Sequence, residues 1–339
     1  MTAGGGGSRK THPPELRHDP LSGRWVLIAP DRARRPNDYR NGRPAWAAGP
    51  RASCPFCPGR EAETPAEVDA LRGQTSVPDS PGWRIRVVPN KYPALVPGPG
   101  PSPGRHEVVI DSPDHEREWA DLPDGHLRDL LETFRRRLRV LENDPAVRYV
   151  QIFKNKGASA GASLRHPHTQ ILAVPEVPRQ IRDEMENLER TAAAEGEGCP
   201  VCRLIEREAA GPRLIQLNPD FAALAPYASR FPYEIHVWPR RHAASFRETG
   251  EAELLILARM LKDLLGRLRA AAGDPDYHLL LRQGPSAGSG AESRAGRRGF
   301  IHWRLEILPI LAAVAGFEWG TGCFINPVLP ESAAAALRG

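Results

Sequence analysis

The sequence predicts an α/β (α+β) fold made of two similar halves in one chain. Three observations predict it. The length of 339 residues corresponds to about two domains. Short motifs recur in the same order along the chain, which indicates a long internal repeat. Each copy also carries an amphipathic helix beside strand-like segments. The 31 glycines and 35 prolines favour short elements joined by many turns.

The composition excludes several classes of protein. Apolar residues at 40% and charged residues at 26% are typical of globular domains and argue against disordered, collagenous and coiled-coil chains. The net charge of +5 comes from arginines spread along the chain, without a basic block, so we expect no nucleic-acid partner. The apolar stretches are shorter than the ~20 residues of a membrane span, and the start has no signal-like apolar segment. We therefore expect no membrane association and a cytoplasmic location.

The repeat begins with two Cys-x-x-Cys motifs, CPFC at Cys54 and CPVC at Cys199. In each copy we match the next two segments by their order. RVVPNKYPAL is matched with IQLNPDFAAL, and HEVVIDSPDH is matched with YEIHVWPRRH. In a chain of this size without an export signal, paired cysteines predict metal half-sites and not a disulfide framework.

A helix and then two strands complete each copy. Apolar side chains at spacings of three and four place one stripe on each helix. The stripes are Leu127, Leu130, Leu131, Phe134, Leu138 and Leu141 in the first copy, and Leu254, Leu257, Leu261, Leu264, Leu265 and Leu268 in the second. YVQIFKNKGASAGASLRHPHTQILAVP and YHLLLRQGPSAGSGAESRAGRRGFIHWRLEILP then read as a strand, a glycine- and serine-rich turn and a second strand.

Each copy combines a Cys-x-x-Cys motif with two histidines, which predicts two closed, structural metal sites. Thiolate and imidazole ligands together suit zinc better than iron, so we expect two zinc ions per chain. The expected ligands are Cys54, Cys57, His115 and His166 in the first site, and Cys199, Cys202, His242 and His302 in the second. We assign no role to Cys323 and expect it to be a buried, unreactive thiol.

The two halves differ at one pair of positions, which indicates where the chemistry lies. His168 and Gln170 in the first copy are replaced by Arg304 and Glu306 in the second. Alternate residues of a strand share one face, so the two first-copy side chains are expected to point the same way. A neutral imidazole beside the glycine-rich loop 155–163 can act as a nucleophile towards phosphorus or as a general base. The small residues of this loop let its backbone approach a phosphate.

These motifs together resemble a known family. HPHTQ after NKGASAGAS, with DPLSGRWVLIAPDRARRP, CPFCPG, VVPNKYPAL and SPDH, resembles the galactose-1-phosphate uridylyltransferase branch of the histidine-triad superfamily, over about residues 19–330. The resemblance implies two fused histidine-triad-like halves, each an antiparallel β-sheet packed with helices. Gln170 occupies the third histidine position, as in the transferase branch, where the hydrolase branch has a histidine.

The resemblance also implies roles for individual residues in a ping-pong transfer. His168 would accept the nucleotidyl group of a nucleotide sugar and pass it to a sugar 1-phosphate, with Gln170 donating a hydrogen bond to a phosphoryl oxygen. The other implied residues hold substrate: Ser163, Gly161 and Asn155 at the outgoing phosphate, Arg32 and Arg35 near the phosphates, and Asn90 and Phe153 at the ribose and base. Homodimerisation is expected from the family alone.

Within the family we expect a UDP-glucose:hexose-1-phosphate uridylyltransferase of galactose metabolism. One alternative is adenylyl transfer of the ADP-glucose phosphorylase type, because the Cys199 set resembles the two-zinc arrangement of those relatives. A second alternative is a zinc-stabilised nucleotide-binding protein without turnover. Trp319 is expected to line a pocket or to belong to the core.

We divide the chain as follows: a disordered tail 1–14, an active-site half 15–178, a connecting helix 179–198, a second half 199–332 and a tail 333–339.

Overall fold

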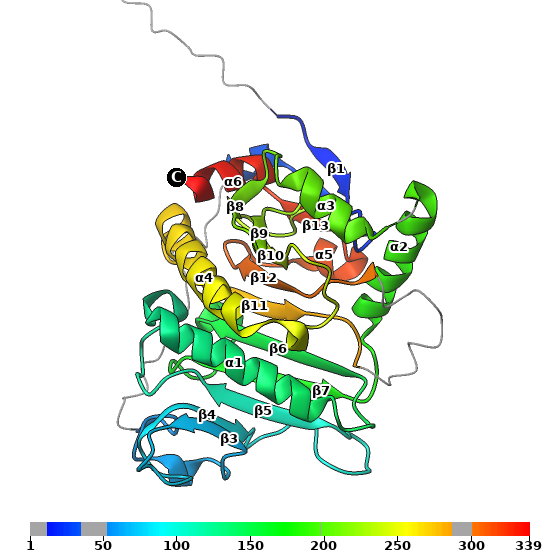
Figure 1. Ribbon diagram of the computed structural model, residues 1–339. Coiled ribbons are helices and arrows are strands. Elements are labelled where there is room, and N and C mark those ends of the chain that lie inside the picture. Colours follow the sequence, from blue (N-terminus) through cyan, green and yellow to red (C-terminus); the bar gives the residue numbers. More distant parts are fainter. Residues whose placement is uncertain (1–11, 35–52, 197, 287–299) are drawn as a thin grey trace, which may run out of the picture.

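The computed structural model describes residues 12–34, 53–196, 198–286 and 300–339. Its centre is one antiparallel sheet of ten strands, seen across the middle of Figure 1. The first copy of the repeat supplies, in spatial order, β3 (Asp69–Arg72), β4 (Trp83–Pro89), β5 (Arg105–Ile110), β7 (His168–Val174) and β6 (Tyr149–Lys156). The second copy continues with β11 (Tyr277–Arg282), β12 (Arg304–Pro309), β10 (Ile235–Pro239), β9 (Phe221–Leu224) and β8 (Leu214–Leu217).

The order of the second five strands mirrors the order of the first five, so the structure contains the predicted repeat. The halves meet where β6 pairs with β11, with Phe153 opposite Leu280. The two sheets that we expected are therefore one continuous sheet. This joint satisfies the backbone groups that two separate sheet edges would leave unpaired.

Two long helices pack side by side on one face of the sheet (Figure 1). They are α1 (Asp124–Leu141) and α4 (Glu251–Ala272). Every residue of the two predicted stripes is buried in the core between these helices and the sheet. Burial of one apolar stripe stabilises a helix of this kind far more than its intrinsic propensity does. Both predicted helices are confirmed.

The opposite face is covered over the second half by α2 (Arg179–Glu195) and α3 (Pro200–Glu208). Met185, Leu188 and Ile205 on these helices share a buried cluster with Leu224 and Trp238 of the sheet. The remaining short elements are the 3₁₀ helices η1 (Pro30–Arg34), η3 (Glu61–Glu63), η4 (Trp119–Asp121), η5 (Ala158–Ala160) and η6 (Phe246–Glu248).

The two ends of the described chain meet in a small second sheet. β1 (Glu15–His18) pairs with β2 (Trp25–Ile28), which also pairs in parallel with β13 (Phe324–Asn326). α5 (Gly316–Thr321) precedes β13, and α6 (Pro330–Arg338) packs against α4 and β8. We expected residues 333–339 to be a tail, but all of them except the terminal Gly339 belong to α6, where Leu337 is fully buried.

The structure corrects the alignment of the two copies. IQLNPDFAAL contains β8, a turn and β9, whereas RVVPNKYPAL contains the end of β4 and the loop after it, so these segments are not equivalent. Val108 lies opposite Gln170, and His236 lies opposite Glu306, so Val108 and His236 are equivalent. The ungapped match had placed Ile235 there. A shift of one residue exchanges the two faces of a strand, so this offset decides which second-copy side chains face the ligand side.

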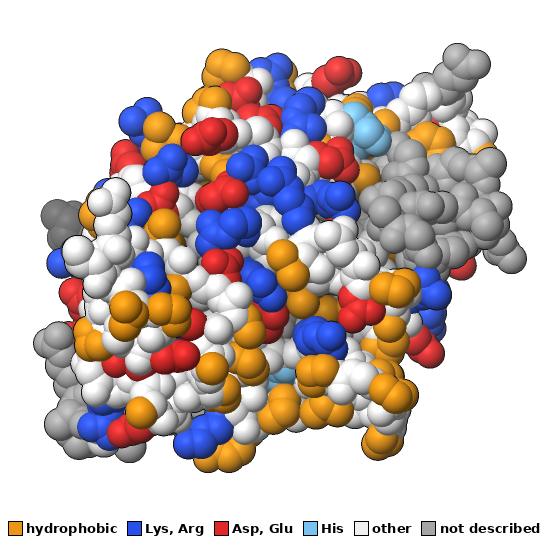
Figure 2. All heavy atoms as spheres, turned by 60° about the horizontal axis from the view of Figure 1, so that its bottom comes forward, with side chains coloured by type: hydrophobic (Ala, Val, Ile, Leu, Met, Phe, Trp, Pro, Cys, Tyr) orange, Lys and Arg blue, Asp and Glu red, His pale blue; other side chains and the backbone are white. Residues whose placement is uncertain are grey.

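Two residues for which we considered a buried position are at least partly exposed. Cys323 is only partly buried, and Trp319 is 80% exposed and therefore not part of the core. Basic and acidic side chains are interspersed over the face shown in Figure 2. Among the described residues we find no helix with the length and apolar character that crossing a bilayer would require.

Candidate functional site

A cavity of about 580 Å³ opens beside the first-copy strands, on the sheet face opposite α1 and α4. Strands β5 and β7, the loop after β4 and the Cys-x-x-Cys segment surround it. Its lining includes Phe56, Asn90, Val108, Ser163, His168 and Gln170. A second cavity of about 420 Å³ adjoins it at His168. Six of the predicted site residues line one or both of these cavities: Asn90, Asn155, Ser163, His166, His168 and Gln170.

His168 is the first residue of β7, and its ring is held in one orientation. Its Nδ1–H donates to the backbone carbonyl of His166 over 2.9 Å, which leaves Nε2 with a lone pair. Only 7% of the residue is exposed, and the Phe56 ring lies against it at 5.4 Å between centroids. Burial is the main cause that lowers the pKa of His168, and the cationic Lys154 lowers it further. The ring is therefore a neutral imidazole at neutral pH.

Gln170 is oriented by a second histidine. The backbone N–H of Ala94 donates to Nδ1 of His106, so the neutral His106 ring carries its proton on Nε2. That nitrogen donates to Oε1 of Gln170 over 2.9 Å. The Asn90 amide nitrogen packs 3.1 Å from Nε2 of His106. Because its carbonyl oxygen is held, the Gln170 side chain keeps its NH₂ group for a ligand in the cavity.

The glycine-rich loop before β7 is anchored by the second half of the chain. The backbone N–H of Ser159 donates to Asp276 over 2.8 Å. Gly157 has φ of 90°, and a Cβ at this position would lie 1.9 Å from Asp276 Oδ1. Only glycine fits this left-handed position without strain. Gly161 closes the η5 turn with φ of 75°.

Asn155 is also fixed from the second half. The Nδ1–H of His278 donates to Asn155 Oδ1 over 2.9 Å, so the Asn155 amide group keeps its donors for a ligand. Phe153 lies opposite Gln170 in the sheet but does not line either cavity beside His168. Arg32 is exposed in η1 and lines neither cavity, and Arg35 lies outside the described residues.

The first predicted metal set is assembled in the structure. Its four ligand atoms lie within 4.8 Å of one another, and all four residues are buried: Cys54, Cys57, His115 and His166. Cys57 Sγ lies 3.3 Å from His115 Nδ1 and 3.6 Å from His166 Nδ1. His166 donates its Nε2–H to the carbonyl of Ser112 over 2.8 Å, which directs Nδ1 towards the thiols. Metal-ligating histidines have this kind of outer hydrogen bond.

The second predicted set is assembled as well, in a more exposed place: Cys199, Cys202, His242 and His302. Both thiols lie 3.3 to 3.4 Å from His302 Nε2, and His242 Nδ1 lies 2.8 Å from the same nitrogen. Two imidazole nitrogens this close, with two thiols beside them, are the arrangement of a metal centre.

The chemistry of both sets fits a bound cation. Without one, burial raises the pKa of Cys54 to about 11 and that of Cys202 to about 12. Burial also lowers the pKa of His166 to about 4 and that of His302 to about 3. A divalent cation would compensate the buried thiolates, and the imidazoles are already neutral as ligands must be. Each set can therefore hold a metal ion.

The sequence did not reveal three of the residues that build this site. His106 occurs in a matched segment, but neither the repeat nor its spacing gave it a partner. Asp276 follows Asp274 and Pro275, a pair that indicates only a turn. Asp111 directly follows β5, and its buried carboxylate accepts hydrogen bonds from Thr169, Trp119 and Lys154. In the sequence, the only indication of this role was an acidic residue, Asp111, directly after the apolar VVI of a predicted strand.

Comparisons with known proteins extend over the whole chain. Residues 100–178 match the model of the galactose-1-phosphate uridyl transferase N-terminal domain. ADP-glucose phosphorylase of Arabidopsis thaliana is 34% identical, with 99% of this chain and 95% of that protein covered. Galactose-1-phosphate uridylyltransferase of Thermotoga maritima is 30% identical, with 96% and 98% covered.

Solved structures of the same two kinds of protein are also similar to this chain. The Arabidopsis thaliana ADP-glucose phosphorylase with bound ADP-glucose superposes with a TM-score of 0.83 at 32% identity, covering 96% of this chain and 98% of that one. A uridylyltransferase structure gives a TM-score of 0.73 at 28% identity, covering 95% and 97%.

Proposed function

We propose a specific reaction for this chain, which belongs to the galactose-1-phosphate uridylyltransferase family of the histidine-triad superfamily and is a nucleotidyltransferase of that family. The nucleotidyl group of a nucleotide sugar is transferred through a covalent intermediate on His168. The observation that carries this proposal is the hydrogen bond from His168 Nδ1–H to the His166 carbonyl, because it leaves Nε2 as a neutral nucleophile facing the cavity.

The proposed transfer consists of two displacements at the α-phosphorus. The Nε2 lone pair of His168 attacks the α-phosphorus, and the bond from this phosphorus to the bridging oxygen breaks. The sugar 1-phosphate leaves with the electron pair. An oxygen of the acceptor phosphate then attacks the nucleotidyl-histidine, and the imidazole leaves as a neutral ring. The lowered pKa of His168 suits both the attacking and the leaving role.

Gln170 stabilises the transition state by donating its amide N–H to a non-bridging phosphoryl oxygen, where negative charge increases. His106 positions that amide by holding Oε1. Removal of one such donor typically costs about 10² to 10³ in rate. The outgoing phosphate is bound by Ser163, the backbone at Gly161 and the Asn155 amide. Ser163 lines the larger cavity, Asn155 lines the adjoining one, and Gly161 lies in the turn between these two residues.

ADP-glucose is the donor that we favour, so that the transferred group is adenylyl and the acceptor is phosphate or a phosphorylated sugar. Two observations support this choice over our first expectation of UDP-glucose. The relative from Arabidopsis thaliana shares more identity and superposes more closely than the uridylyltransferases quoted above. In the second half, the Cys/His set is present that we matched to the two-zinc arrangement of the ADP-glucose phosphorylase relatives.

Uridylyl transfer from UDP-glucose to a hexose 1-phosphate is the second candidate. The Thermotoga maritima relative, with nearly complete coverage at 30% identity, supports it. Asn90 contacts the ribose in either case. The chain acts as a homodimer, by analogy with the family.

Zinc is the ion that we propose for both Cys/His sets, because a closed set of two thiolates and two imidazoles favours it. When bound, it would join the Cys-x-x-Cys segments to the sheet and contribute folding free energy. No step of the transfer passes through it.

Intact-protein mass spectrometry tests the function directly. The zinc-loaded protein is exposed separately to ADP-glucose and to UDP-glucose, and the expected result is a covalent adenylyl adduct with ADP-glucose that His168→Ala lacks. A uridylyl adduct alone would select the second candidate. The absence of any adduct with both donors would favour a nucleotide-binding protein without turnover.

A further inference from the structure

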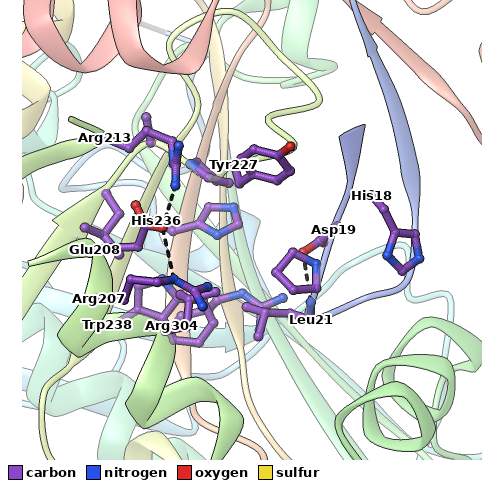
Figure 3. Close-up of a pocket in the computed structure, with 15 residues that line it drawn as sticks. His18, Asp19, Leu21, Arg207, Glu208, Arg213, Tyr227, His236, Trp238 and Arg304 are labelled. Atoms are coloured by element: carbon purple, nitrogen blue, oxygen red, sulfur yellow. Dashed lines mark hydrogen bonds and ion pairs between the residues drawn. The ribbon is translucent and has the colours of Figure 1, made fainter. Parts of the chain in front are cut away.

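A third cavity, of about 340 Å³, lies on the same sheet face in the second half (Figure 3). Its place in the repeat is that of the active-site cavity. His236 lies opposite Glu306 as Val108 lies opposite Gln170, and both His236 and Val108 line their cavities. Helix α3, which carries the second Cys-x-x-Cys motif, forms one wall, as the first motif does in the first half.

At the position of the nucleophile, this cavity has an arginine. Arg304 is equivalent to His168 and is 4% exposed, with its guanidinium 4.8 Å from the centre of the Trp238 ring. Three of its five N–H groups donate to Glu306 and Glu184, which leaves two for a ligand. A guanidinium has no lone pair for attack on phosphorus, but it binds phosphate oxygens well. Arg304 can therefore bind a phosphate group but cannot accept a nucleotidyl group.

The acidic side chains of the lining are already occupied. Asp19 accepts hydrogen bonds from the backbone N–H of Leu21 and the hydroxyl of Ser22, and Glu208 accepts one from Arg213 over 2.6 Å. The lining holds three arginines. Arg304 is paired with Glu184 and Glu306, and Arg213 is paired with Glu208 and Glu331. The third arginine, Arg207, is 64% exposed and lies 3.9 Å from Glu208, so most of its donors face solvent.

Other groups of the lining suit the hydroxyls and the body of a ligand. His236 donates its Nε2–H to Glu234 over 2.9 Å, which leaves Nδ1 as an acceptor. Figure 3 shows His236 and Tyr227 directed into a space that Asp19 and Leu21 close on the opposite side. Leu21, Leu204 and Leu224 supply apolar surface.

We propose that this second-half cavity is a non-catalytic binding site for a small phosphate ester, of the sugar 1-phosphate or nucleoside monophosphate class. The phosphate binds Arg304 and Arg207, and the hydroxyl-bearing body lies against Leu204 and Leu224. The volume lies within the ~300 to 1,000 Å³ of small-molecule sites. This assignment is independent of the reaction at His168, since it rests on the arginines and the cavity of the second half alone.

Equilibrium dialysis of the full-length, zinc-loaded protein tests the proposal. The radiolabelled probes are inorganic phosphate, glucose 1-phosphate and AMP, each measured with the wild type, with Arg207→Glu and with Leu204→Trp, which fills the cavity. Arg259→Glu is the matched control, because Arg259 is an exposed arginine of α4 that pairs with Asp124. We expect the wild type and the control to bind one more molecule per chain of glucose 1-phosphate or AMP than the two cavity variants do.

Equal binding by the wild type and both cavity variants would overturn the proposal, and so would a difference seen with inorganic phosphate alone, which would indicate a simple anion site. Covalent labelling of His168 is measured in parallel and should be unchanged in both cavity variants. If the transfer function is wrong, labelling fails in every protein while the difference in dialysis persists, so the two failures are distinguishable.

Discussion

The backbone carbonyl of His166 accepts the Nδ1–H of His168 over 2.9 Å. The same His166 places its imidazole in the first Cys/His set and donates its Nε2–H to the carbonyl of Ser112. One residue thus joins a metal set, the loop after β5 and the ring that we propose as nucleophile. Because the hydrogen bond selects the tautomer of His168, displacement of His166 would also change which nitrogen of that ring can react.

His168→Ala is expected to abolish covalent labelling and to lower turnover by at least about 10³-fold, because the nucleophile is lost. The fold should remain, since the residue contributes little apolar packing. Labelling by mass spectrometry and the melting temperature are the measurements, with the exposed His12→Ala as the matched control. Normal turnover of His168→Ala would remove this residue from the mechanism.

Cys54→Ser is expected to lower the zinc content from about two ions per chain to about one, and to destabilise the first half. Labelling of His168 should fall as well, because His166 loses its place. Elemental analysis and thermal unfolding measure the two effects. Cys323→Ser is the control, since Cys323 belongs to neither set. Unchanged metal content in Cys54→Ser would refute the ligand assignment.

His106→Ala is expected to lower kcat by about tenfold, less than the ~10²-fold of Gln170→Ala, with little change in KM. The reason is that His106 acts only by fixing the Gln170 amide. His106→Gln can donate to the same oxygen and should restore most of the rate. Steady-state kinetics of the three variants decide the matter, and a rise in KM with unchanged kcat would mean that His106 serves binding instead.

Gly157→Ala is expected to destabilise the protein by about 1–3 kcal/mol and to slow labelling, because the new Cβ meets Asp276 in a left-handed backbone position. Gly125→Ala, at an exposed position of α1 with no atom near its added Cβ, is the matched control and should leave stability unchanged or slightly raised. Denaturant unfolding of both variants measures the difference. Equal stability of the two would show that the loop is not held against Asp276.

Much of the fold and of the metal sites could be predicted from the sequence because both depend on spacing. The leucine stripes of α1 and α4 follow from helical periodicity, and the two Cys-x-x-Cys motifs with their histidines recur in order. His168 stood out because Arg304 replaces it in the other copy. These signals are local, or they compare one copy with the other.

The rest depends on contacts that no local pattern encodes. The pairing of β6 with β11 joins segments more than 120 residues apart in the chain, as Phe153 and Leu280 show. The one-residue offset between the copies arises in the loop before His115, and sequence comparison without a gap could not place it. His106 acquires its role only through the fold, which brings the Ala94 backbone and Gln170 to opposite sides of its ring.

The second copy contributes two contacts to the first: β11 pairs with β6, and Asp276 accepts a hydrogen bond from the glycine-rich loop. A shortened protein without the second copy would lose both. A fragment ending before α3 would contain the proposed nucleophile His168, the Gln170 amide and the first pair of thiols. It would nonetheless expose the unpaired edge of β6, which favours self-association. Its glycine-rich loop would also lose the hydrogen bond to Asp276. The second copy thus supports the site of the first, and we expect that separating the two copies would impair both folding and nucleotidyl transfer.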